Sequence, residues 1–118
     1  MSAIEVRGLC PIKGEITVQG SKNAVLPMMA GAVLNNGITV INNVPRIQDV
    51  FCMMGILDSL GCRCALHGNR LEIDTSKMNG WRIEQKAMGK MRSSIMLLGA
   101  LLGRFCEAGV YSPGGCMI

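Results

Sequence analysis

The sequence predicts an α/β fold of the α+β kind, in which one order of strands and helices is repeated. One observation is a set of short runs in which apolar and polar residues alternate, which is typical of half-buried strands. A second is that apolar residues recur at helical spacing in segments 24–34 and 50–60. A third is that the same order begins again at Trp81. We therefore predict one complete βαβαββ unit at about 14–75 and the first half of a second at about 80–118.

Two predicted strands precede the first helix. Residues 4–7 alternate and end before Gly8. Residues 15–19 alternate between Gly14 and Gly20, and both glycines are expected to end regular structure. We therefore expect residues 15–19 to form the first strand of unit one.

The first helix is predicted to begin after Ser21, a favourable N-cap residue, and to continue to Leu34. Pro27 is compatible with this helix if the helix proper begins about three residues earlier, because first-turn N–H groups have no partner within a helix. The Asn-Asn-Gly segment 35–37 ends the helix, and residues 38–41 are predicted to form a strand.

The second helix is predicted to begin near Asp49, which we expect to help cap it. It should end at Gly61, because glycine is favoured just after a helix. A hairpin then follows, with strands at 62–66 and 71–73 and a turn at 67–69. We assign His67, the only histidine, to that turn and not to catalysis.

The second unit is predicted to contain a strand at 81–83, a helix at about 92–105 and a strand at 109–112. Aligning Lys22 with Arg92 brings the first helix of one unit onto that of the other, at a spacing near seventy residues. The identity between the two units is weak, but the pattern agrees along their length. This alignment predicts an internal structural repeat.

Lys22 and Arg92 therefore occupy equivalent positions in the first turn of an apolar helix. The helix dipole disfavours a positive charge there by a few tenths of a kcal/mol. A bound anion would remove that penalty, because the helix N–H groups and the cation would act on it together. The two cations are candidate anion ligands, although two solvated residues at helix ends would give the same pattern. Neutral hydrogen-bonding residues flank both: Ser21 and Asn23, and Ser93 and Ser94.

The C-terminal segment 112–118 is a candidate catalytic loop. It contains Pro-Gly-Gly followed by Cys116. Glycines leave backbone N–H groups able to face an anion, and a thiol among such groups and basic side chains ionises more readily than usual. An ordinary turn with Cys116 as a small apolar filler is the alternative reading of this loop alone.

Composition excludes several classes of function. The chain has 118 residues, of which 49% are hydrophobic and 3% aromatic, and its formal net charge is +4. Its basic residues are scattered and no aromatic ladder accompanies them, so we expect small anions and not nucleic acid as partners. The longest apolar run, at 95–102, is too short to span a bilayer, so we expect no membrane association.

The six cysteines are expected to be reduced thiols. The first residues show no signal peptide, and several cysteines fall within helical or strand patterns, so a cytoplasmic location is predicted. Cys62, Cys64 and His67 lack a second ligand pair at zinc-binding spacing. We therefore expect no metal and no cofactor.

Five motifs stand out along the chain: Gly20-Ser21-Lys22-Asn23-Ala24, Asn42-Asn43-Val44-Pro45, Leu60-Gly61, Met91-Arg92-Ser93-Ser94-Ile95 and Pro113-Gly114-Gly115-Cys116. Together they resemble the N-terminal part of the enolpyruvyl transferase family, and specifically its UDP-N-acetylglucosamine 1-carboxyvinyltransferases. The resemblance runs in register along the whole chain. The shikimate-pathway enolpyruvyl transferases share the fold, but they usually have serine after the lysine and lack the Gly-Gly-Cys loop.

The resemblance implies roles for four residues. Lys22 and Asn23 match the residues that bind phosphoenolpyruvate, and Arg92 matches an arginine associated with the UDP-sugar. Cys116 matches the proton donor, which can bond covalently to phosphoenolpyruvate and which fosfomycin alkylates. The implied reaction is enolpyruvyl transfer to the 3′-hydroxyl of UDP-N-acetylglucosamine with release of phosphate, the first committed step of peptidoglycan synthesis.

The resemblance also implies an incomplete site. The family folds as an inside-out α/β barrel with two domains of three such units, and segment 1–13 joins the other domain as a strand. The family's aspartate base and further phosphate ligands lie beyond the part matched here. We therefore expect the remainder of the enzyme to be a partner, and the isolated chain to be inactive. A truncated module that binds an anion, a nucleotide sugar or another protein, and a shikimate-pathway enzyme, are the alternatives.

Overall fold

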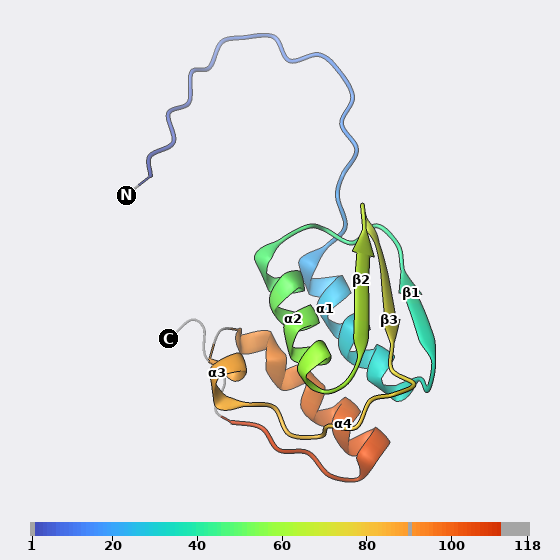
Figure 1. Ribbon diagram of the computed structural model, residues 1–118. Helices are drawn as coiled ribbons and strands as arrows, with labels where there is room; N and C mark the ends of the chain where they lie inside the picture. Colours follow the sequence, from blue (N-terminus) through green and yellow to red (C-terminus); the bar gives the residue numbers. More distant parts are fainter. Residues whose placement is uncertain (1, 90, 112–118) are drawn as a thin grey trace.

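A small antiparallel sheet covered on one face by helices forms the body of the molecule (Figure 1). The computed structural model describes residues 2–89 and 91–111. Strands β1 (Ile38–Ile41), β3 (Arg70–Asp74) and β2 (Arg63–His67) lie in the order β1-β3-β2. This confirms the mixed α/β character that the periodicity predicted.

The register of the sheet places Leu71 and Ile73 of β3 on the helix side. In this register Ile73 of β3 lies opposite Thr39 of β1 and Cys64 of β2. Leu71 and Ile73 are fully buried, as expected for alternate residues that share one face of a strand. The predicted hairpin is confirmed, with Gly68 in the left-handed region (φ 61°) of its turn.

The two helices of unit one are also confirmed. Helix α1 spans Lys22–Gly31 and continues as the 3₁₀ helix η1 (Ala32–Leu34), and α2 spans Gln48–Ser59. Gly61 follows α2 with φ 93°, and a Cβ there would lie 2.7 Å from Oδ1 of Asn79. Only glycine therefore fits this position without strain.

Pro27 lies deeper in α1 than expected. Because α1 begins at Lys22, the proline is the sixth residue of the helix and falls beyond its first turn. Proline has no N–H, so the carbonyl of Asn23 has no donor four residues along the helix.

The second unit is only partly regular. Arg82 and Gly109 form an isolated parallel bridge where strands 81–83 and 109–112 were expected. The predicted helix at 92–105 is present as the 3₁₀ helix η2 (Arg92–Met96) followed by α4 (Leu97–Phe105). A short helix, α3 (Gln85–Met88), was not predicted.

The helices and the sheet enclose one apolar core that joins the two units. Its residues are aliphatic, as the low aromatic content predicted, with methionine filling several positions. The largest fully buried side chains are Leu26, Met29, Met53, Leu57, Leu60, Leu71, Ile73, Ile83, Met88, Leu97, Leu101 and Val33.

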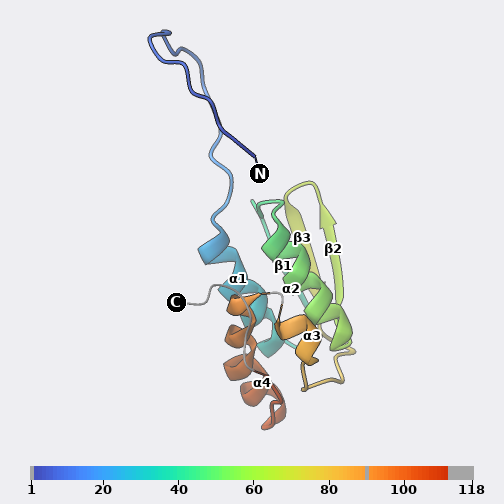
Figure 2. The ribbon, with the colours of Figure 1, turned by 90° about the vertical axis from the view of Figure 1, so that its left-hand side faces the viewer.

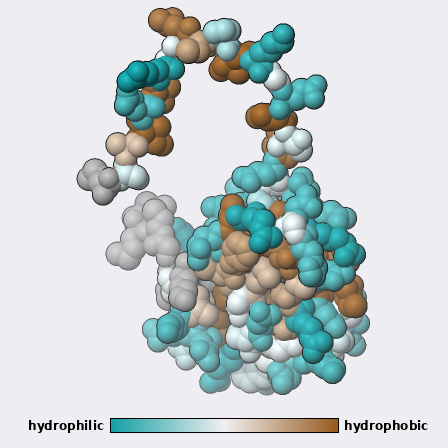
Figure 3. Space-filling model, turned by 45° about the horizontal axis from the view of Figure 1, so that its top comes forward, coloured by the Kyte–Doolittle hydropathy of each residue, from teal (hydrophilic) through white to brown (hydrophobic). Residues whose placement is uncertain are grey.

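The prediction of strands at 4–7 and 15–19 is wrong for this structure. Residues 2–20 contain no strand and extend away from the body (Figures 1 and 2). Figure 3 shows hydrophobic and hydrophilic residues alternating along this arm. Residues 2–19 of the arm are exposed, and Ile16 is 93% exposed. A strand forms only when a neighbour supplies its hydrogen-bond partners, and the body pairs no strand with this segment.

Candidate functional site

Gly20, the first residue of the 20–24 motif, lies where the arm joins α1, and the packing there requires a glycine. A Cβ on Gly20 would lie 1.7 Å from the carbonyl oxygen of Asn43, far inside a permitted contact. Asn43 itself adopts φ 56°, and the next amide, of Val44, donates to the carbonyl of Asn69 at 2.8 Å. Two motifs that are far apart in the sequence therefore pack backbone to backbone beside the start of α1.

Lys22, the predicted phosphate ligand, is the first residue of α1 and forms an ion pair. Its Nζ lies 3.3 Å from Oδ2 of Asp49, and the two side chains are 51% and 33% exposed. Asp49 lies in the first turn of α2, where a carboxylate is favoured by the helix dipole. The ion pair therefore holds the starts of α1 and α2 together.

Asp49 was expected to cap α2, and that expectation is wrong. The N-cap residue is Ile47, and within residues 2–89 and 91–111 no side chain caps this helix. Ser21 does occupy the N-cap position of α1, but its side chain likewise makes no capping hydrogen bond among the described residues. First-turn N–H groups of a helix have no partner within the helix, so an anion at the start of α1 would find donors there.

Asn23 is the second residue of α1 and is exposed beside Lys22. Its backbone carbonyl is the one that Pro27 leaves without a helical donor. Asn23 thus offers a side-chain amide and an acceptor oxygen on the same turn. An amide can bind a carboxylate or a phosphate through its NH₂ group.

Arg92 begins η2 and is exposed. The expectation that Ser94 would face a ligand beside it is wrong. Ser94 is fully buried, and its hydroxyl donates to the carbonyl of Met91 at 2.6 Å. A short polar side chain buried in this way normally bonds to nearby backbone. Ser93, which is partly exposed, stays a candidate for a neutral ligand.

The two repeated helices run side by side in the same direction (Figures 1 and 2). The start of the second, η2, contacts α1, and the body of α4 contacts η1 at the end of the first. Lys22 and Arg92 therefore both mark the leading ends of a parallel helix pair. Cys116 lies outside the described residues, so its position relative to this pair stays a prediction.

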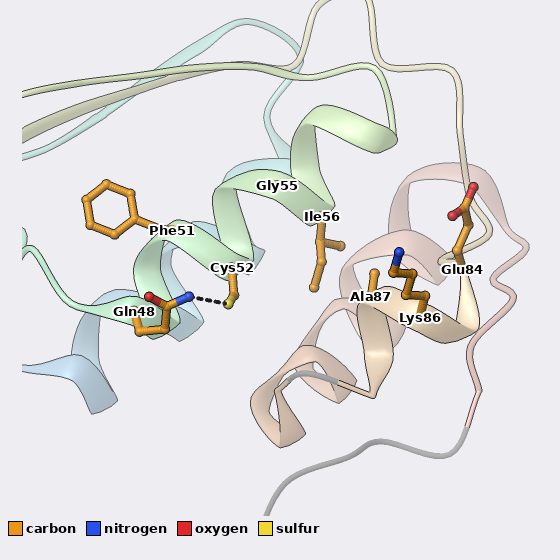
Figure 4. A pocket seen from close by; sticks show the side chains of 8 residues that line it. All are labelled: Gln48, Phe51, Cys52, Gly55, Ile56, Glu84, Lys86 and Ala87. Atoms are coloured by element: carbon orange, nitrogen blue, oxygen red, sulfur yellow. Dashed lines mark hydrogen bonds between the residues drawn. The ribbon is translucent and has the colours of Figure 1, made fainter.

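Two of the cavities in the described part of the chain lie away from these residues. One, of about 380 Å³, separates α2 from α3; Figure 4 shows Gln48 and Cys52 of α2 along one side, joined by a 3.6 Å contact, and Ala87 and Lys86 of α3 on the other. The other, of about 530 Å³, lies beside β2 and is lined in part by Cys62 and Cys64. Neither is lined by Lys22, Asn23 or Arg92, and we assign no function to them.

Cys62 and Cys64 are poor nucleophiles. Burial raises the pKa of Cys62 to about 11, although the positive charge of Arg104 acts in the opposite direction. Burial also raises the pKa of Cys64 well above its ordinary value, and the nearby Asp58 carboxylate adds to that rise. Because the thiolate is the reactive form, both thiols are inert at neutral pH.

Within residues 2–89 and 91–111, no three His, Cys, Asp or Glu side chains gather in a way that could hold a metal ion. In the same part of the chain, every helix is too short or too polar to cross a bilayer.

Residues 6–118 match the family described as EPSP synthase (3-phosphoshikimate 1-carboxyvinyltransferase). The chain belongs to this family of enolpyruvyl transferases. It is 39% identical over 118 residues to UDP-N-acetylglucosamine 1-carboxyvinyltransferase 2 of Caldanaerobacter subterraneus subsp. tengcongensis. It is 41% identical over 118 residues to the UDP-N-acetylglucosamine 1-carboxyvinyltransferase of Trichlorobacter lovleyi. The match covers 100% of this chain and 28% of each of these relatives.

The chain therefore spans little more than a quarter of the length of the curated relatives it matches. Its fold is similar to that of the enolpyruvyl transferase NikO from Streptomyces tendae, with a TM-score of 0.74 at 22% identity. That likeness covers 83% of this chain and 23% of the other. The enolpyruvyl transferase fold is thus supported by sequence and by structure.

Proposed function

We propose that this chain forms the N-terminal part of a UDP-N-acetylglucosamine 1-carboxyvinyltransferase. Such an enzyme transfers the enolpyruvyl group of phosphoenolpyruvate to the 3′-hydroxyl of UDP-N-acetylglucosamine and releases phosphate. The observation that carries the proposal is 39 to 41% identity, along the whole chain, to enzymes of that name. The parallel helix pair that begins at Lys22 and Arg92 supports it further.

In the proposed site, Lys22 and Asn23 hold phosphoenolpyruvate at the start of α1, and Arg92 holds the UDP-sugar. Cys116 donates its proton to the methylene carbon of phosphoenolpyruvate. The adjacent carbon then becomes electron-deficient and bonds to the 3′-oxygen, whose proton passes to a base outside this chain. Loss of phosphate, and of a proton from the new methyl group, restores the double bond. Fixed cations suit these steps because they hold the anionic phosphate and carboxylate of phosphoenolpyruvate and stabilise the negative charge of the departing phosphate.

The proposed enzyme acts in peptidoglycan synthesis in the cytoplasm, and fosfomycin would alkylate Cys116. We also propose that the complete protein folds as an inside-out α/β barrel, with segment 1–13 as a strand of the second domain. The base and further phosphate ligands would then come from residues absent here. For that reason we expect negligible turnover by the 118-residue chain, and turnover comparable to that of a full-length enzyme would contradict this.

A chimeric enzyme tests the proposal. It joins this chain to the part of the Trichlorobacter lovleyi relative that lies beyond the matched region. We expect phosphate release with phosphoenolpyruvate and UDP-N-acetylglucosamine, and none when Cys116→Ser is introduced. A folded chimera that releases no phosphate would contradict the proposal. Activity with shikimate 3-phosphate instead would favour the shikimate-pathway alternative.

A truncated binding module is the second alternative, because the open edges of a sheet readily pair with other chains. Titration of the chain with UDP-N-acetylglucosamine separates binding from catalysis. If the chain binds UDP-N-acetylglucosamine but the chimeric enzyme is inactive, the result would favour the truncated binding module.

A further inference from the structure

Arg104 makes more side-chain hydrogen bonds than any other residue in the described structure. It lies at the opposite end of the helix pair from Lys22 and Arg92, the two predicted anion ligands. It is in the last turn of α4. Its Nη1 donates to the carbonyl oxygens of Val33 and Asn35 at 3.0 Å each, and to Oγ1 of Thr75 at 3.1 Å. Its Nη2 donates to the carbonyl of Thr75 at 2.7 Å and to Oδ1 of Asn36 at 3.4 Å.

These acceptors belong to two segments of unit one. Val33 lies in the last turn of the first helix, Asn35 and Asn36 directly follow that helix, and Thr75 directly follows β3. The last carbonyls of a helix lack partners within the helix and carry partial negative charge, so a guanidinium is well suited to them. Arg104 therefore fastens the end of the second unit's helix to the end of the first unit's helix and to the sheet.

Thr75 makes this anchor rigid. It is fully buried; its amide donates to the carbonyl of Gly37 at 3.0 Å, and its hydroxyl also bonds to the carbonyl of Asn35. Beside it the helices approach closely, because a Cβ on Gly103 would lie 2.8 Å from Cδ2 of Leu34.

We propose that Arg104 is a positioning residue for the anion site: it fixes the axial register of η2–α4 against α1 and so sets where Arg92 lies relative to Lys22. The inference rests on the proposed function. Because η2 runs directly into α4, a shift of α4 along its axis at Arg104 would also shift Arg92, at the other end of the same helix. A lysine cannot replace it, since an ammonium lacks the planar fork that serves several acceptors at once.

The test compares the 118-residue chain with its Arg104→Lys variant, which keeps the charge and loses the fork. Ile73→Val, a fully buried change in β3 that leaves every hydrogen bond of Arg104 in place, is the control for loss of stability. Two quantities are measured: the Overhauser contacts that join η2 to α1 in the 118-residue chain, by NMR, and the affinity of the chimeric enzyme for phosphoenolpyruvate, by calorimetric titration.

We expect Arg104→Lys to lose or rearrange the contacts between η2 and α1 and to weaken phosphoenolpyruvate binding at least fivefold. Ile73→Val should leave both unchanged at a comparable melting temperature. Retention of the contacts between η2 and α1 in Arg104→Lys would overturn the inference, whatever the affinity for phosphoenolpyruvate. An equal loss of affinity in Ile73→Val would overturn it too. Altered contacts together with a folded wild-type chimera that binds no phosphoenolpyruvate would contradict the proposed function and, with it, the role of Arg104 in an anion site.

Discussion

At the scale of single residues, replacing Lys22 should affect catalysis much more than it affects the stability of the fold. Its ion pair with Asp49 is half exposed, and such pairs contribute at most about 1 kcal/mol. We therefore expect Lys22→Met to change the free energy of unfolding by less than about 1 kcal/mol. In the chimeric enzyme the same change should lower kcat/KM for phosphoenolpyruvate by more than about 100-fold, because a charged ligand of the phosphate is lost. Urea unfolding and steady-state kinetics measure the two effects, and a large loss of stability with intact kinetics would argue against the assignment.

The raised pKa of the Cys62 thiol predicts how the stability of the folded chain depends on pH. Below about pH 9, the thiol is protonated in both the folded and the unfolded chain. Between pH 9 and about 11 the unfolded chain releases its proton while the folded chain retains it, so the folded state loses stability as pH rises through this window. Melting temperatures of wild type and Cys62→Ala measure the effect. The wild type should show the steeper fall, and parallel curves would show that Cys62 does not titrate as its burial implies.

At the scale of elements, two glycines at α1 should respond oppositely to alanine: Gly20, which lies two residues before the helix, and Gly31, which is its last residue. Gly20→Ala places a Cβ against the Asn43 carbonyl, and we expect a loss of about 1–3 kcal/mol, as for other overpacked sites. Gly31 has helical φ and open space around it, so Gly31→Ala should stabilise by up to about 1 kcal/mol. Urea unfolding of the matched pair tests this, and equal effects would mean that the contact at Gly20 is not tight.

The elements that sequence reasoning predicted are those whose signal is local. The apolar stripes of α1 and α2, the glycine after α2 and the Gly68 turn all depend on residues close in the chain. The short helix α3 shows no apolar stripe and was missed. The strands at 4–7 and 15–19 have the right alternation, but pairing depends on a partner that no local pattern reveals.

The candidate site could also be predicted only where its signal is local in the sequence. The repeat correctly placed Lys22 and Arg92 at equivalent helix starts. It could not predict that Asp49 pairs with Lys22 instead of capping α2, because that contact joins two helices. Nor could it predict that Ser94 turns inward, since the adjacent Ser93 has the same local signal.

At the scale of the whole molecule, the N-terminal arm and the body should behave as separate parts. Residues 2–19 are exposed and make no strand, so we expect trypsin to cleave first after Arg7 and Lys13. The product, 14–118, should keep the melting temperature of the intact chain, because the arm contributes no residue to the buried core. Mass spectrometry over time follows the cleavage, with the bond after Arg104 as the internal control for a protected site. Equal cleavage of all three would contradict this division.

The most direct test of the account is alkylation of Cys116 by fosfomycin in the chimeric enzyme, followed by peptide mass spectrometry. A phosphonate epoxide reaches this thiol quickly only if the cations hold its anionic group beside the sulfur. We predict that Cys116 is modified much faster than the exposed Cys10 and Cys106, that phosphoenolpyruvate slows the modification, and that Lys22→Met or Arg92→Met slows it at least tenfold. Modification of Cys116 no faster than that of Cys10 and Cys106, or at a rate unaffected by either substitution, would contradict a single anion site formed by Lys22, Arg92 and Cys116.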